Sequence, residues 1–120
     1  MPDQLLGDWL LPAPAAYAIA GSSCTPPVTV ATCMFKLTFT ATTYNWTTNV
    51  SGFANGGGGA VVKGSEMDFF SGATCGIKLP DGVGRYTWTL SGGALHFTSM
   101  GSDPCPRSQF LADQTYSRTG

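Results

Sequence analysis

Short segments in which apolar and polar residues alternate fill most of this chain of 120 residues. In Met34–Thr40, aromatic and aliphatic side chains alternate with Lys and Thr, and Arg85–Ser91 repeats the pattern around Tyr86 and Trp88. A period of two places successive side chains on opposite faces of a half-buried β-strand. Because each such strand must bury its apolar face, the pattern predicts a small antiparallel β-barrel.

Turn residues divide the chain into about eight strands of this kind. The expected strands are Gly7–Leu11, Met34–Thr40, Thr42–Val50, Ala60–Lys63, Glu66–Phe70, Val83–Leu90, Ala94–Ser99 and Gln114–Arg118. Eight strands close a barrel just wide enough to be filled by side chains or to hold one small ligand. We therefore predict an all-β, antiparallel up-and-down barrel in which residues 1–120 form a single domain.

The connections between these strands carry signals of their own. Ser91-Gly92-Gly93 is the clearest hairpin turn, and Pro106–Ala112 is expected to form one short helical turn before the last strand. Ala15–Ala20 fits either a helical turn or a strand. Gly52–Gly59 contains four consecutive glycines, whose backbone loses much entropy on ordering, so we expect a mobile loop there. Such a loop is either a gate for a ligand or an inert hairpin end.

Charge is sparse and balanced in this chain. Charged residues make up 11% of it, and the formal net charge is −1. The six basic residues are scattered, so they do not form the basic stripe that binds nucleic acid. No apolar stretch is long enough to predict a transmembrane segment, and no signal peptide or cofactor site is evident. A surface rich in hydroxyl groups rather than ion pairs is typical of secreted β-proteins.

Four cysteines, Cys24, Cys33, Cys75 and Cys105, indicate two disulfides. They lack the CxxC spacing and the nearby histidines of a zinc site. We favour pairing of Cys24 with Cys33, which closes a proline-rich loop, and of Cys75 with Cys105. The alternative is four free buried thiols in a cytosolic protein. Disulfides predict an oxidising compartment, so we expect a secreted or periplasmic protein.

The inward face of the strands is expected to be strongly aromatic. Its expected members, which are also the candidate ligand-binding residues, are Phe35, Phe39, Tyr44, Trp46, Met67, Phe69, Tyr86, Trp88 and Phe97. Two interpretations stay open, a packed aromatic core and a binding pocket. The hydroxyl and indole groups of tyrosine and tryptophan need hydrogen-bond partners when buried, and a ligand with oxygen atoms would supply them.

The sequence gives only weak signals for a catalytic or metal-binding site. His96, the only histidine, falls on the outer face by phase, whereas a Ser-His-Asp triad would need it inside. A single histidine also argues against a transition-metal or haem site. Glu66 and Asp68 share one face of a strand, about 6.5–7 Å apart, a separation suited to acid–base chemistry. However, they alternate with Met67 and Phe69, which are expected to point inward. Glu66 and Asp68 are therefore predicted to lie on the solvated outer surface.

The chain resembles the lipocalins of the calycin superfamily, in particular small lipocalin-like proteins of bacteria. The matching residues are Gly7-Asp8-Trp9, which has the GxW pattern of the first strand, and Arg118 on the last strand. The segments 84–90, 95–97 and 103–107 resemble the C-terminal half of the secreted bacterial members. The chain is shorter than typical lipocalins and lacks their TDY-type turn motif and long C-terminal helix. The resemblance implies that Trp9 lies at the closed end of the barrel with Arg118 across its ring.

These observations lead to three hypotheses about function. The first is a secreted protein, a monomer or weak dimer, that holds a small hydrophobic or aromatic molecule inside the barrel. The second is a barrel-fold enzyme, such as a cyclase or a simple hydrolase, in which the same cavity acts by shape and Tyr44, Tyr86 or Trp88 donates a hydrogen bond. The third is a structural or inhibitor-like domain with a packed interior. Because no triad or metal site is recognisable, binding without catalysis is preferred.

Overall fold

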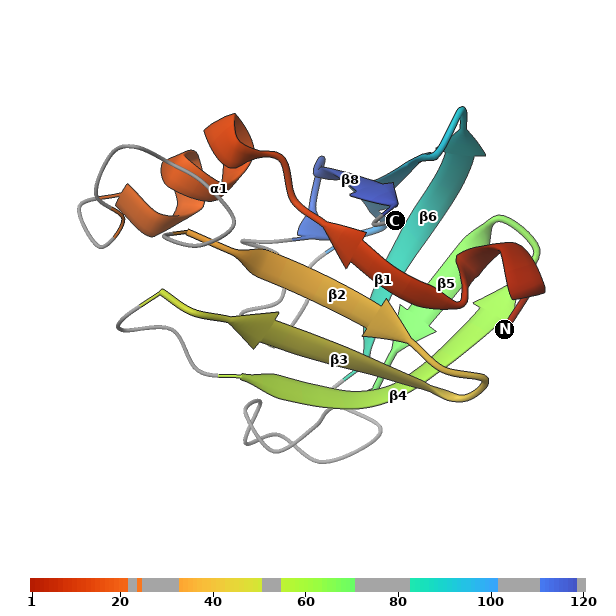
Figure 1. Cartoon of the computed structure of the whole chain (residues 1–120). Coiled ribbons are helices and arrows are strands. Elements are labelled where there is room, and N and C mark those ends of the chain that lie inside the picture. The colour runs from red at the N-terminus through yellow and green to blue at the C-terminus, as the bar shows by residue number, and fades with distance from the viewer. Residues whose placement is uncertain (22–23, 25–32, 51–54, 71–82, 102–110, 119–120) are drawn as a thin grey trace.

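The computed structural model of the chain describes residues 1–21, 24, 33–50, 55–70, 83–101 and 111–118. These residues form eight strands in one closed sheet, in which the strand order follows the chain and all neighbours are antiparallel (Figure 1). The strands are β1 (Gly7–Leu10), β2 (Phe35–Phe39), β3 (Thr43–Thr48), β4 (Gly56–Lys63), β5 (Glu66–Phe69), β6 (Gly84–Ser91), β7 (Ala94–Ser99) and β8 (Thr115–Arg118). The predicted up-and-down antiparallel barrel is confirmed.

The barrel closes where the first strand meets the last. β1 pairs with β2 along its whole length and with β8 at Trp9↔Arg118 and Leu10↔Ser117. A short 3₁₀-helix, η1 (Asp3–Leu5), precedes β1. Because β1 has a partner on both sides, the sheet has no free edge among the described strands.

The two-residue period determines which side chains fill the barrel. In β2, Phe35, Leu37 and Phe39 are buried, while Lys36 and Thr38 between them are partly exposed. The same alternation in the other strands directs one row of side chains inward, and most of these rows contain an aromatic residue. The hairpin at Ser91-Gly92-Gly93 is also confirmed, with φ of 56° at Gly92 and 80° at Gly93. Both glycines have the left-handed backbone that a two-residue hairpin turn demands.

The glycine run is strand, and the expectation of a mobile loop there is wrong for Gly56–Gly59. These four glycines pair with Thr43–Trp46 of β3 and form the first half of β4. The physical reason is that β3 extends far enough to supply hydrogen-bonding partners, and that the two backbones approach very closely. A Cβ on Gly57 would lie 2.5 Å from the carbonyl oxygen of Tyr44, so only glycine fits at this point of the strand pair.

Ala15–Ala20, for which the sequence allowed either a helical turn or a strand, is helical. Helix α1 (Ala13–Ala20) is rich in alanine, the best helix former, and Pro12 and Pro14 stand at its start, where their missing N–H groups cost nothing. Gly21, with φ of 58°, ends it. No helix within the described residues has the length and apolar character needed to cross a membrane. In Figure 1, α1 lies beyond the end of β1, on the side of the barrel opposite the N-terminus.

The predicted disulfide between Cys24 and Cys33 is confirmed, with the two Cα atoms 5.7 Å apart. Both cysteines are buried, and the bridge ties the segment after α1 to the start of β2. The predicted partners Cys75 and Cys105 lie outside the described residues. So does most of Pro106–Ala112, the expected helical turn.

Candidate functional site

One end of the barrel is closed by Trp9 and Arg118. The guanidinium carbon of Arg118 lies 4.1 Å from the centroid of the Trp9 ring, which is the contact that the resemblance implied. Arg118 also donates hydrogen bonds to the backbone carbonyls of Gln4 and Leu6, and the indole Nε1 of Trp9 donates to the Leu5 carbonyl at 3.0 Å. These contacts fasten η1 across the barrel end.

The glycine of the GxW pattern has a structural reason at this end. Gly7 has φ of 102°, a conformation that residues with a side chain rarely adopt. A Cβ at Gly7 would also lie 3.2 Å from Nη1 of Arg118. The glycine therefore permits the turn from η1 into β1 and the close approach of the arginine.

The middle of the barrel is filled by aromatic rings. The ring of Phe69 lies 4.9 Å from that of Tyr44, 5.5 Å from Tyr86 and 5.9 Å from Phe97, all edge-to-face. Phe39 lies 6.2 Å from Phe69 in a tilted arrangement. Such geometries are favourable for aromatic pairs, and they make this layer a packed floor.

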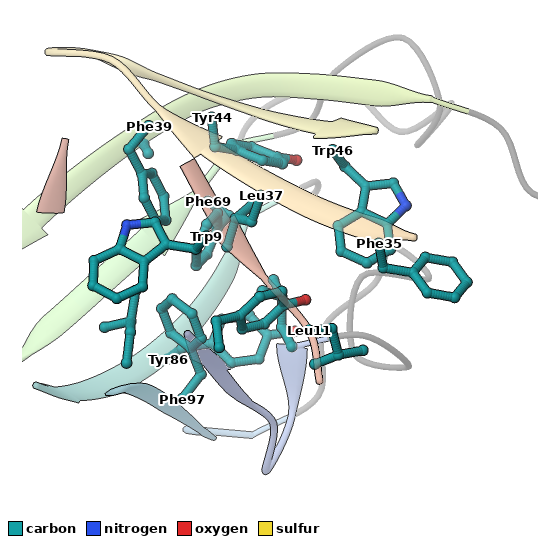
Figure 2. Close-up of a cluster of buried hydrophobic side chains, with 14 of the residues drawn as sticks. Trp9, Leu11, Phe35, Leu37, Phe39, Tyr44, Trp46, Phe69, Tyr86 and Phe97 are labelled. Carbon is teal, nitrogen blue, oxygen red and sulfur yellow. The ribbon is translucent and has the colours of Figure 1, made fainter. Parts of the chain in front are cut away.

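A second aromatic group lies toward the end that faces α1. Phe35 stacks on Trp46 with ring centroids 5.2 Å apart, and Trp46 meets Tyr116 edge-to-face at 6.5 Å. Figure 2 shows Trp9 at one end of the buried cluster and Phe35 and Trp46 at the other. In that view the hydroxyl of Tyr44 and the indole nitrogen of Trp46 both point toward the Phe35 end. These two polar atoms therefore lie toward the Phe35 end of the cluster, away from Trp9.

The barrel wall beside these rings carries no side chains. In the pairing of β3 with β4, Trp46 is opposite Gly56 and Tyr44 is opposite Gly58. Residues directly opposite in an antiparallel pair point to the same face, so both glycines are inward positions. Beside Trp46 and Tyr44, the inner surface of β4 therefore consists of backbone atoms alone.

Tyr116 is a buried site residue that the sequence analysis did not include. It is fully buried, and burial together with the neighbouring Tyr86 raises its pKa well above the ordinary value of 10.0. The signal that would have found it is simple, because Tyr116 lies two residues before Arg118 and so shares its strand face. Its phenol is a neutral hydrogen-bond donor at any physiological pH.

The other predicted inward residues differ in how deep they lie. Phe35, Phe39, Tyr44, Trp46, Met67, Phe69, Tyr86 and Phe97 are all buried. Trp88 is only half-buried, and its Nε1 donates to the carbonyl of Gly64 at 3.0 Å. Since Gly64 belongs to the turn between β4 and β5, Trp88 packs at the barrel rim, away from the Phe35 end of the cluster.

The expectation of a solvated surface at Glu66 and Asp68 is wrong for Asp68, which is only 3% exposed. The predicted face of the strand is correct, because Asp68 alternates with the inward Met67 and Phe69. Its carboxylate is held by Lys63 of the adjacent strand, with Nζ 3.2 Å from Oδ2. A hydrogen bond to Asp68 is the main cause that raises the pKa of Glu66, followed by desolvation and by the charge of Asp68.

The outer face also carries the histidine and a small polar network. Nδ1 of His96 lies 2.7 Å from the hydroxyl of Thr115 on the neighbouring strand. Asp8 accepts a hydrogen bond from Thr38 at 2.7 Å, and Lys36 lies 3.9 Å from its carboxylate. Among the described residues, no group of three or more His, Cys, Asp or Glu side chains is arranged to hold a metal ion.

No protein-family model matches this chain, and comparisons with curated proteins and with solved structures give no match.

Proposed function

We propose that this chain binds a small apolar or aromatic molecule at the barrel end formed by Phe35, Tyr44 and Trp46. The observation that carries the proposal is the pairing of Trp46 and Tyr44 with Gly56 and Gly58. Without side chains on these glycines, the wall beside the two rings is backbone alone, and the proposed ligand is a flat molecule that packs between this backbone and the rings. Concave apolar sites with a few polar groups are the usual form of small-molecule sites.

The remaining predicted ligand-binding residues support this placement. Phe39, Met67, Phe69, Tyr86 and Phe97 form the packed floor beneath the site, and Trp88 belongs to the rim. Because Arg118 and η1 close the Trp9 end, the ligand enters from the side of α1.

The same features support a lipocalin-like assignment. The eight-stranded up-and-down barrel, the Gly7-Asp8-Trp9 start and the arginine over the tryptophan ring all agree with that family. We propose further that the chain acts as a single domain, a monomer or weak dimer, in an oxidising compartment, secreted or periplasmic. The Cys24–Cys33 disulfide supports this location, because disulfides persist outside the reducing cytosol.

The test is a fluorescence titration with N-phenyl-1-naphthylamine, an uncharged probe that brightens in an apolar site. We expect a saturable increase with the wild-type protein. Gly58→Val adds a branched side chain on the inward face and is expected to weaken binding at least tenfold. Gly59→Val is the matched control, since an ideal Cβ there points outward and meets the Phe70 ring at an ordinary 3.5 Å.

Both variants are checked for folding by far-ultraviolet circular dichroism and thermal unfolding. A second measurement that does not depend on either variant is the nuclear Overhauser effect between probe protons and the Trp46 ring of the wild type. Absence of saturable binding refutes the function. Saturable binding without contacts to Trp46, with equal affinity in both variants, refutes the site.

A further inference from the structure

We infer that Glu66 and Asp68 share one proton on the outer wall of the barrel and form a pH-sensitive contact, which stabilises the fold in acid and is lost as the pH rises. This contact does not depend on ligand binding, because both side chains lie on the face of β5 opposite the aromatic rings. Three observations carry it: the burial of Asp68, the state of one of its carboxylate oxygens and the position of the nearby cations.

The carboxylate of Asp68 is buried although it belongs to the outer face of β5. Its Oδ2 lies 3.2 Å from Nζ of Lys63 on β4. Its other oxygen, Oδ1, is buried and has no hydrogen-bond partner among the described residues. A buried charged acceptor that lacks a donor destabilises the folded state, so a donor at Oδ1 would stabilise it.

Glu66 is the group placed to supply that donor. It lies two residues before Asp68 in β5, so both side chains share one face of the strand. Lys63 is opposite Glu66 in the strand register, yet its ammonium lies against Asp68, and the described residues contain no ion pair of Glu66. A carboxylate only accepts hydrogen bonds, whereas a protonated carboxyl group carries one O–H. Protonated Glu66 can therefore donate to Oδ1 of Asp68, while ionised Glu66 places a second negative charge beside it.

The groups on the two neighbouring strands decide which carboxyl holds the proton. On β4, Lys63 lies against Asp68, and on β6, Arg85 is opposite Asp68 while the uncharged Thr87 is opposite Glu66. Lys63 and Arg85 also favour the ionised form of Glu66. The hydrogen bond with Asp68, desolvation and the negative charge of Asp68 outweigh them and raise the pKa of Glu66. Because two carboxyls in such contact titrate as a pair, the proton lies on Glu66 while Asp68 stays ionised.

The direction of the pH effect follows from the raised pKa of Glu66. The stabilisation is complete below the unfolded pKa of 4.5 and is lost as the pH rises through the folded value. The proton then leaves to water, Oδ1 of Asp68 loses its donor, and two negative charges remain side by side. The contact therefore stabilises the pairing of β5 with its neighbours at mildly acid pH and does not do so at neutral pH.

The first experiment follows the proton in the wild-type protein. A carbon-13 NMR titration from below pH 4.5 to neutral pH records the side-chain carboxyl shifts of Glu66 and Asp68. We expect Glu66 to titrate above 4.5 and the Asp68 signal to move in the same step, because its oxygen loses the shared proton at that point. A Glu66 step at 4.5 or lower refutes the shared proton, and so does a step that leaves the Asp68 signal in place.

The second experiment tests the effect on stability with Glu66→Gln. Glutamine carries an amide that donates at every pH, so this variant keeps the contact when wild-type Glu66 is ionised. Folding equilibrium constants come from urea unfolding below pH 4.5 and at neutral pH. The ratio of the variant's constant to the wild-type constant should rise about fivefold between the two conditions, the effect of one net hydrogen bond.

Asp3→Asn is the matched control, since it removes one negative charge from an exposed side chain at the start of η1. Its ratio to wild type should change far less between the two conditions. A Glu66→Gln ratio that stays constant or falls, or one that rises no more than the Asp3→Asn ratio, overturns the inference.

Discussion

Replacing Gly57 by alanine tests how closely the glycine strand approaches its neighbour. An ideal Cβ at Gly57 lies 2.5 Å from the carbonyl oxygen of Tyr44 and 2.8 Å from Oδ1 of Asn45. The first of these atoms belongs to the backbone and cannot rotate away, so β4 must shift against β3. Forcing a methyl group into such packing costs about 1–3 kcal/mol, and the smaller entropy of the unfolded alanine chain offsets about 0.4–1 kcal/mol. We expect a net loss of at most about 2.6 kcal/mol in the free energy of unfolding, and of about 1.3 kcal/mol at the middle of both ranges.

Gly59→Ala is the matched control in the same strand. Its Cβ meets the Phe70 ring at 3.5–3.9 Å, an ordinary contact, so the entropic gain remains and stability should rise slightly. Urea unfolding followed by tryptophan fluorescence gives both free energies, provided that the slope with denaturant is unchanged. If Gly57→Ala proves as stable as Gly59→Ala, the pairing Asn45↔Gly57 is refuted, and with it the wall beside Trp46.

Three further predictions concern charge and ionisation. Arg118→Met should lower the free energy of unfolding by about 1–3 kcal/mol and Arg118→Lys by less, because methionine loses both the contact with Trp9 and the backbone hydrogen bonds; equal losses in urea unfolding would contradict this. Because the pKa of Tyr116 is raised in the folded state, its contribution to stability is complete below the ordinary pKa of 10.0 and declines as the pH rises toward the folded value. Unfolding measured across that range should show a smaller decline for Tyr116→Phe than for wild type, and identical declines would refute the burial argument. In Asp68→Ala the pKa of Glu66 should fall toward 4.5, since the hydrogen bond that raises it is lost, and carboxyl shifts in an NMR titration would reveal an unchanged value if this cause is wrong.

The strands could be predicted where side chains mark the period of two. β2 and β6 alternate ring-bearing or aliphatic residues with Thr and Lys or Arg, and both were expected within a residue or two of their observed ends. The first half of β4 could not be predicted in this way. Glycine has no side chain to alternate, and its flexibility in isolation gives no sign that a neighbouring strand will order it.

The face on which most interior side chains lie was predictable, with Tyr116 missed, and their depth was less so. Phase alone assigns a side chain to a face of the barrel, but it does not say what covers that face. Asp68 was expected to be solvated and is buried beside Lys63, while Trp88 was expected inside and lies half-exposed at the rim. Depth depends on contacts between segments far apart in the chain, which a local period does not contain.

The same alternation that made the fold predictable also sets the charge of the interior. A strand with strict period two can carry lysine, arginine or glutamate without placing any of them inside, as β2 does with Lys36 and β6 with Arg85. The described strands therefore keep Lys36, Lys63 and Arg85 on the outer face of the wall, while Arg118, which shares the inward register, lies over the Trp9 ring.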